Sequence, residues 1–97
     1  MVRQDIIERI RARAETVRSL GATALYINGS RARGDDRPDS DLDVFVDFDP
    51  IRFSFVELVE LEDMLSRELG LKVQLGTHDA LHPLIKSTIE REAVRVL

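Results

Sequence analysis

The sequence contains no cysteine, no long apolar run and no excess of basic charge. Without cysteine the chain forms neither disulfides nor zinc thiolate sites, and it has no cysteine nucleophile. No stretch approaches the ~20 apolar residues that a membrane-spanning helix needs. The first residues carry a charge every few positions, unlike the apolar core of a secretory signal peptide. These features predict a cytoplasmic protein without a membrane partner.

Acidic residues outnumber basic ones, 18 Asp and Glu against 14 Lys and Arg, which gives a net charge of −4. Nucleic acid is therefore not expected as the main partner, because non-specific binding to a polyphosphate depends on a basic surface. An acidic protein still binds a nucleotide when a divalent cation lies between its carboxylates and the phosphates. The charge balance favours metal-assisted chemistry.

The 97 residues suffice for one domain, and no repeat, linker or low-complexity segment divides them. The spacing of apolar residues, a capping box at Ser54–Glu57 and the positions of Gly and Pro mark the secondary structure. Helices are predicted at 3–20, at 54–70 and from Pro83, and strands at 24–27, 42–48, 72–75 and 94–97. This order predicts one domain over residues 1–97 with an α/β (α+β) fold, a small mixed sheet of three or four strands flanked by helices.

Two short segments carry the residues best suited to chemistry. Gly29-Ser30 follows a buried strand; Gly29 allows a ligand to approach the backbone closely, and Ser30 offers a hydroxyl and an N–H at the start of a short helical turn. Asp41 and Asp43 share the acidic face of a strand whose other face is apolar. Two such carboxylates can share Mg²⁺ ions. The phosphates of the substrate and water then complete the coordination shell of the metal. Each segment alone is common, and their combination is far more specific.

Gly29-Ser30-x-Ala32-Arg33-Gly34, followed after five residues by Ser40-Asp41-Leu42-Asp43-Val44, resembles the signature of the DNA polymerase beta superfamily of nucleotidyltransferases. Within it, the chain is similar to the minimal nucleotidyltransferases (MNT). The resemblance implies that Gly29 and Ser30 hold the triphosphate of ATP, that Asp41 and Asp43 bind two Mg²⁺ ions, and that Arg33 lies near the phosphates. The implied reaction is attack by an acceptor hydroxyl on the α-phosphate, with release of pyrophosphate.

Minimal nucleotidyltransferases often act as antitoxins of a HEPN-domain toxin, in some cases by transferring AMP to it. Active members usually present a third carboxylate on the next core strand, where this chain has Gln74. Glutamine offers a neutral oxygen to a metal but cannot accept the proton of an attacking hydroxyl. Two functions therefore stay open. The chain either transfers AMP to a hydroxyl of its partner, or it binds nucleotide with weak or no activity and neutralises the partner by binding alone.

Two groups of carboxylates are candidates to replace the missing one. Asp47 lies on the same strand face as Asp43 but about 13 Å further along, beyond the reach of a shared metal. Asp35, Asp36 and Asp39 lie on a flexible polar approach to the motif and could swing in toward the metals, although the carboxylates of such a surface loop are usually only solvated.

Other metal and nucleotide motifs do not fit. Asp39, Asp41 and Asp43 match the first positions of an EF-hand loop, but its required Gly and Glu are Val44 and Pro50 here. No Gly-Lys-Ser/Thr of a P-loop follows Gly29.

The remaining charged residues are expected on the surface. His78 and His82 are four apart, but no sustained helix would bring them together on one metal. The arginines of the first helix are expected to form a solvated face. The sequence leaves open the preferred nucleotide, the acceptor and whether the chain forms a homo-oligomer.

Overall fold

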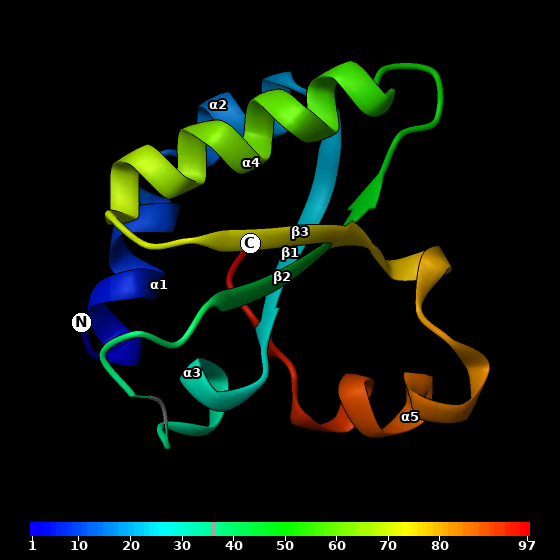
Figure 1. The fold of residues 1–97 in the computed structure, drawn as a ribbon. Helices are drawn as coiled ribbons and strands as arrows, with labels where there is room; N and C mark the ends of the chain where they lie inside the picture. The colour runs from blue at the N-terminus through cyan, green and yellow to red at the C-terminus, as the bar shows by residue number, and fades with distance from the viewer. Residues whose placement is uncertain (36) are drawn as a thin grey trace.

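The computed structural model describes residues 1–35 and 37–97. Its elements in chain order are α1 (Arg3–Arg11), α2 (Ala14–Ser19), β1 (Ala22–Asn28), α3 (Ser30–Arg33), β2 (Leu42–Phe48), α4 (Phe55–Leu69), β3 (Val73–Thr77), the 3-10 helix η1 (His78–Ala80), α5 (Pro83–Glu92) and β4 (Val94–Arg95). The strands form one sheet in the order β3-β2-β1-β4, with helices around it (Figure 1). The predicted fold, a small mixed sheet flanked by helices, is confirmed.

Strand β1 is antiparallel to both of its neighbours, β2 and β4, whereas β2 and β3 run parallel. A parallel pair needs a crossover connection, and helix α4 supplies it between β2 and β3. The sheet is therefore mixed, and its two central strands are those that carry the Gly-Ser turn and the Asp-x-Asp segment.

The hydrophobic core lies between one face of the sheet and helices α1, α2 and α4, which Figure 1 shows together on one side. Strand β2 contributes Leu42, Val44 and Val46, each at most 3% exposed. Since side chains alternate across a strand, the intervening residues face the opposite side of the sheet. That opposite face is free of the core and carries the candidate site.

The ends of helix α4 follow the predicted signals. The backbone N–H of Ser54 donates to the Glu57 carboxylate at 2.9 Å, which confirms the capping box. Gly70 ends the helix with a φ of 64° in the left-handed region, a conformation that glycine adopts without a steric penalty.

The predicted helix over residues 3–20 is wrong in one respect, because the structure divides it into α1 and α2. The N–H of Arg13 donates to the carbonyl of Ile10 instead of continuing the α-helical pattern. Helix α1 contacts α4, whereas α2 contacts β1. The turn at residues 12–13 thus allows the apolar residues of α1 to pack toward α4 and those of α2 to pack toward β1.

The predicted strands are all present; β2 has the predicted ends, and the ends of the other three are shifted. β1 is longer than residues 24–27, and β4 covers only two residues of the predicted 94–97. β3 continues past Leu75 because Gly76 and Thr77 pair with Phe45 and Val46 of β2. This extension brings position 76 onto the face of the candidate site.

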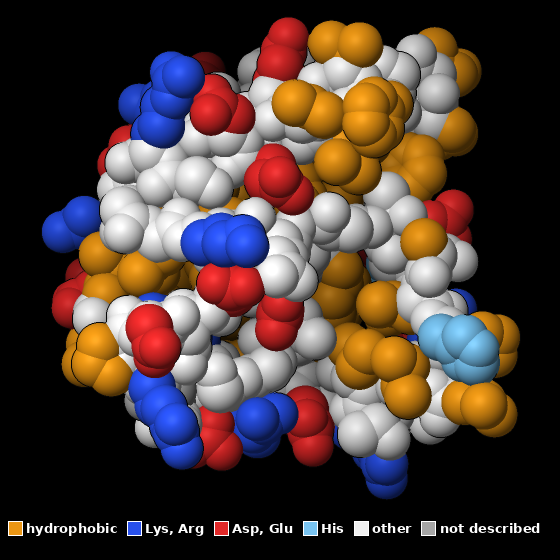
Figure 2. All heavy atoms as spheres, viewed as in Figure 1, with side chains coloured by type: hydrophobic (Ala, Val, Ile, Leu, Met, Phe, Trp, Pro, Cys, Tyr) orange, Lys and Arg blue, Asp and Glu red, His pale blue; other side chains and the backbone are white. Residues whose placement is uncertain are grey.

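Helix α5 differs from the other long helices, because none of its residues is buried. Exposed apolar side chains gather over α5 and over the first turns of α4, where Figure 2 shows two groups of orange atoms; they include Leu84 and Ile85 of α5 and Phe55, Val56 and Val59 of α4. Among the helices that the structure describes, none is long and apolar enough to cross a membrane.

Candidate functional site

The face of the sheet that points away from the core presents its side chains in register. Asp43 of β2 pairs with Asn28 of β1 on one side and with Gln74 of β3 on the other. In the next row, Phe45 lies between Tyr26 and Gly76. The strand pairing therefore brings the position of the expected third carboxylate, now Gln74, directly beside Asp43.

Asp41 and Asp43 lie at the start of β2, Asp41 immediately before the strand and Asp43 within it. The side-chain amide of Gln74 donates a hydrogen bond of 2.8 Å to Oδ2 of Asp41. Burial raises the pKa of Asp43, and the negative charge of Asp41 raises it further. A cation between the two carboxylates would relieve this repulsion, so the pair suits a hard divalent ion such as Mg²⁺.

Gly29 joins β1 to α3 and lies against the Asp43 side chain. Its φ of 78° and ψ of −159° fall in a region that essentially only glycine occupies. A Cβ at this position would stand 2.6 Å from Oδ2 of Asp43. Ser30 follows as the first residue of α3. The structure thus brings the Gly-Ser turn and the Asp-x-Asp segment into contact.

Arg33, the third residue expected near a phosphate, is exposed at the end of α3. Its guanidinium pairs with Asp35 at 3.2 Å and with Glu92 of α5 at 3.4 Å. The side chain is therefore directed toward α5 in this structure, and it would have to exchange these surface ion pairs to meet a phosphate.

Arg31 is a residue that the sequence interpretation missed. It is only 1% exposed, although arginine is rarely buried. Its Nε donates to the carbonyl of Ser40 at 2.9 Å, and a terminal nitrogen donates to the carbonyl of Pro38 at 3.4 Å. Arg31 thereby connects α3 to the backbone just before Asp41. No sequence signal separates it from the exposed Arg33, two residues away.

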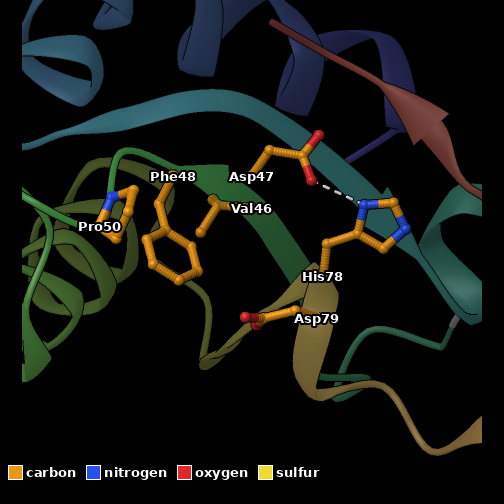
Figure 3. Close-up of a pocket in the computed structure, with 6 residues that line it drawn as sticks. All are labelled: Val46, Asp47, Phe48, Pro50, His78 and Asp79. Carbon is orange, nitrogen blue, oxygen red and sulfur yellow. Dashed lines mark hydrogen bonds and ion pairs between the residues drawn. The ribbon is translucent and has the colours of Figure 1, made fainter.

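His78 lies at the surface, as predicted, but it is only partly exposed. Its imidazole is 25% exposed and lies between two carboxylates, with Nδ1 2.7 Å from Asp47 and Nε2 2.7 Å from Glu90 (Figure 3 shows the Asp47 contact). Both partners are carboxylates, so the protonated imidazole, which carries an N–H on each ring nitrogen, satisfies both contacts at once. The hydrogen bond with Glu90 raises the pKa of His78, and the bond with Asp47 adds to this. His82 is exposed as expected, and its Nδ1 accepts from the N–H of Leu84 at the start of α5.

An aromatic cluster separates this histidine from the carboxylates of the candidate site. Phe45 stacks on Tyr26 with ring centroids 4.8 Å apart, and His78 lies 5.1 Å from Phe45. The Tyr26 hydroxyl donates to Asp47 at 3.0 Å. Asp47 thus contacts Tyr26 and His78, and along β2 Phe45 stands between it and Asp43.

The loop carboxylates do not complete a metal site in the described residues. Asp35 pairs with Arg33, Asp39 is exposed, and Asp36 lies outside the described part of the chain. Over residues 1–35 and 37–97, no group of three or more His, Asp or Glu side chains could hold a metal. The two strand carboxylates and Gln74 are therefore the candidate ligands.

Comparison with known proteins found a family model and relatives that match most of this chain. A family model described as "Nucleotidyltransferase domain" matches residues 7–96. The protein adenylyltransferase MntA of Thermococcus cleftensis is 40% identical over 76 residues, which cover 78% of this chain and 76% of that protein. A protein of Methanocaldococcus jannaschii, provisionally named a protein adenylyltransferase, is 43% identical over 75 residues and 75% of each chain.

Solved structures share the same arrangement of elements. One, provisionally described as a minimal nucleotidyltransferase, has a TM-score of 0.72 and 36% identity, and the match covers 91% of this chain and 93% of the other. A complex of a tri-AMPylated HEPN toxin with its MNT antitoxin from Shewanella oneidensis matches with a TM-score of 0.70 over 99% of this chain and 72% of that one. At 15% identity this second match concerns the fold alone.

Replacing Gly29 with alanine tests the contact between the turn and Asp43. We expect Gly29→Ala to cost about 1–3 kcal/mol of unfolding free energy from the backbone conformation, and more where the methyl group displaces the Asp43 carboxylate. The same substitution in an Asp43→Ala background is the control, because the backbone cost is unchanged there while the carboxylate that the methyl group would meet is absent. Urea unfolding measures both. Equal losses of unfolding free energy would show that the Asp43 carboxylate does not restrict the side chain at position 29.

The pH dependence of stability tests the His78 contacts. Because its pKa is raised in the folded protein, the stabilisation is fully present below the unfolded value of about 6.5 and is lost as the pH rises through the higher folded value. We expect the melting temperature to fall over this window in the wild type and to fall less in Glu90→Gln. Glu92→Gln, which alters only the pair with Arg33, should behave as the wild type. A proton NMR midpoint for His78 at or below 6.5 would contradict the assignment.

Proposed function

Since this chain belongs to the nucleotidyltransferase domain family, we propose that it transfers AMP from ATP to a hydroxyl group of a partner protein. The observation that carries the proposal is the contact between Gly29 and Asp43, which joins the two halves of the family signature into one site. A relative at 40% identity is named a protein adenylyltransferase, which supports this choice among nucleotidyl transfers. In the proposal, residues 1–97 act as one domain.

The proposed nucleotide site has two parts. Gly29 and Ser30 bind the triphosphate, because the glycine leaves the backbone open to a phosphate and the serine supplies hydrogen-bond donors. Asp41 and Asp43 would hold Mg²⁺, two ions by the family resemblance, which would supply positive charge opposite the phosphates. Arg33 reaches the phosphates only after it leaves Asp35 and Glu92.

The proposed reaction is a single in-line displacement at the α-phosphorus. The acceptor oxygen forms a bond to this phosphorus while the bond to the bridging oxygen of the β-phosphate breaks. Pyrophosphate leaves with the bonding electron pair, and the hydroxyl proton passes to water. The protein contributes mainly by holding charges in fixed positions.

Gln74 limits the rate in this proposal. Its amide occupies Oδ2 of Asp41, and it can neither accept the hydroxyl proton nor add negative charge for a second metal. The same observation favours a second candidate function, a nucleotide-binding antitoxin that neutralises its partner by binding alone. Weak transfer and pure binding differ only in the chemical step, so both retain the same nucleotide site.

The proposed partner is a HEPN-domain toxin, and the proposed location is the cytoplasm. The MNT antitoxin in the Shewanella oneidensis complex shares this fold and is bound to such a toxin. In the proposal this partner supplies the acceptor hydroxyl.

Removal of the two carboxylates tests the metal-dependent nucleotide site. We expect the double variant Asp41→Asn, Asp43→Asn to lose measurable binding of ATP·Mg²⁺, because no charged ligand remains for the metal. Calorimetry on the wild type with and without Mg²⁺ gives the reference. Asp5→Asn with Asp63→Asn, an equal loss of charge on the helices α1 and α4, is the control and should bind normally. Tight binding that needs neither Mg²⁺ nor the carboxylates would place the site elsewhere.

Restoring a carboxylate at position 74 tests the chemical step. We expect Gln74→Asp to raise the rate of AMP transfer to a bound partner, since general-base assistance is typically worth ~10² to 10⁴-fold. Mass measurement of the partner after incubation with ATP and Mg²⁺ gives the rate. Gln4→Asp, the same change at the other glutamine of the chain, is the control.

Three results would decide between the functions. Faster transfer by Gln74→Asp than by the wild type supports an adenylyltransferase slowed by its glutamine. Full-rate transfer by the wild type, with a slower variant, would mean that the base comes from another residue. No transfer by either form to a partner that both bind would favour the binding-only antitoxin.

A further inference from the structure

A hollow of about 290 Å³ opens on the site face beside Asp43 and Gln74. Phe45 lines it from the sheet, and Leu81 lines it from the segment between η1 and α5. Small-molecule sites usually measure ~300–1,000 Å³, so this volume suits one side chain or one base rather than a whole nucleotide. Neither Gly29 nor Ser30 contributes to the described lining.

Gly76 also lines this hollow, and nothing in the local structure requires a glycine there. It is absent from the glycines with positive φ, and a Cβ at this position would meet no atom within 4 Å. A glycine inside a strand weakens the strand, and it often marks a place where a ligand approaches closely. The absence of a side chain at position 76 therefore leaves open space in the hollow that Phe45 and Leu81 also line.

We propose that this hollow receives the hydroxyl-bearing side chain of the acceptor, and that Gly76 sets the size of the side chain that can enter. The assignment rests on the proposed function, and it adds a subsite and a residue that determines specificity. The acceptor oxygen then reaches the α-phosphorus as pyrophosphate departs on the other side.

The position of the hollow favours the acceptor over the base of the nucleotide. Attacking and leaving oxygens lie on opposite sides of the phosphorus in an in-line displacement. In the sheet order β3-β2-β1-β4, Asp43 stands between Gly29, which follows β1, and Gly76 in β3. With pyrophosphate on the Gly29 side, the attacking group belongs on the Gly76 side.

The chemistry of the lining indicates a neutral acceptor. The described residues around the hollow include the carboxylate of Asp43 and no Lys or Arg. In the proposed site the Mg²⁺ on Asp43 already faces the triphosphate, so a further phosphate group would find no Lys or Arg in this lining to pair with. Phe45 and Leu81 instead offer apolar contact, and Gln74 and Asn28 offer amide groups to a hydroxyl. A protein side chain that carries a hydroxyl meets both conditions.

Filling the hollow tests the assignment with two separate probes. The nucleotide probe is α,β-methylene-ATP with Mg²⁺, which cannot transfer AMP, and its affinity is measured by calorimetry. The acceptor probes are the N-acetyl amides of serine, threonine and tyrosine, titrated while the amide NMR signals of Phe45 and Leu81 are followed. The test variants are Gly76→Ala and Gly76→Val. The control is Thr23→Val, at an exposed position on β1.

We expect Gly76→Val to leave the nucleotide affinity within about twofold of the wild type and to weaken the best acceptor probe by at least about tenfold, since the hollow is then overpacked. Gly76→Ala should give a smaller loss in the same direction, and its single methyl group fits the open space if the valine disturbs folding. Thr23→Val should bind both probes as the wild type does.

Other outcomes overturn the assignment. A tenfold loss of nucleotide affinity in Gly76→Val, with unchanged acceptor probes, would show that the hollow holds the base. A wild type that binds the nucleotide but responds to none of the three amides would show that no acceptor side chain enters, and the proposed function would still stand. A wild type that binds no nucleotide would overturn the proposed function and this assignment together.

Discussion

The alternation of side chains along β2 is the constraint on which the rest of the structure depends. Leu42, Val44 and Val46 are buried against the helices, so Asp43 and Phe45 must point to the other face of the sheet. A shift of one residue in register would expose the core residues and bury the carboxylate. The free energy of packing the core thus also fixes the position of the candidate metal ligand.

The neighbouring strands then determine what stands beside this carboxylate. Parallel pairing with β3 brings Gln74 next to Asp43, and the turn after β1 brings the Gly29 backbone against it. The close approach of Gly29 is available only to a residue without a Cβ. The site is consequently assembled from three strand segments that are far apart in the chain, and no single loop builds it.

Much of the fold, and which residues meet in the candidate site, could be predicted from the sequence, because these features follow from local patterns. Periodicity and end signals gave the strands and helix α4, and the spacing of the two signature segments indicated which residues would meet. The bend between α1 and α2 could not be predicted, since it depends on which surfaces the two halves cover. The role of His78 also depended on tertiary structure, because its partners Asp47 and Glu90 come from β2 and α5.

The two arginines of α3 look equivalent in the sequence, yet the structure tolerates replacement of one far better than replacement of the other. Arg33 is exposed and forms surface ion pairs, so the fold itself would tolerate many replacements there. Arg31 is buried with its planar guanidinium on backbone carbonyls, where lysine offers a single point of charge and a neutral residue leaves acceptors without a donor. Substitutions at position 33 can therefore adapt to the ligand without loss of the fold. Substitutions at position 31 would disturb the backbone that leads into the site.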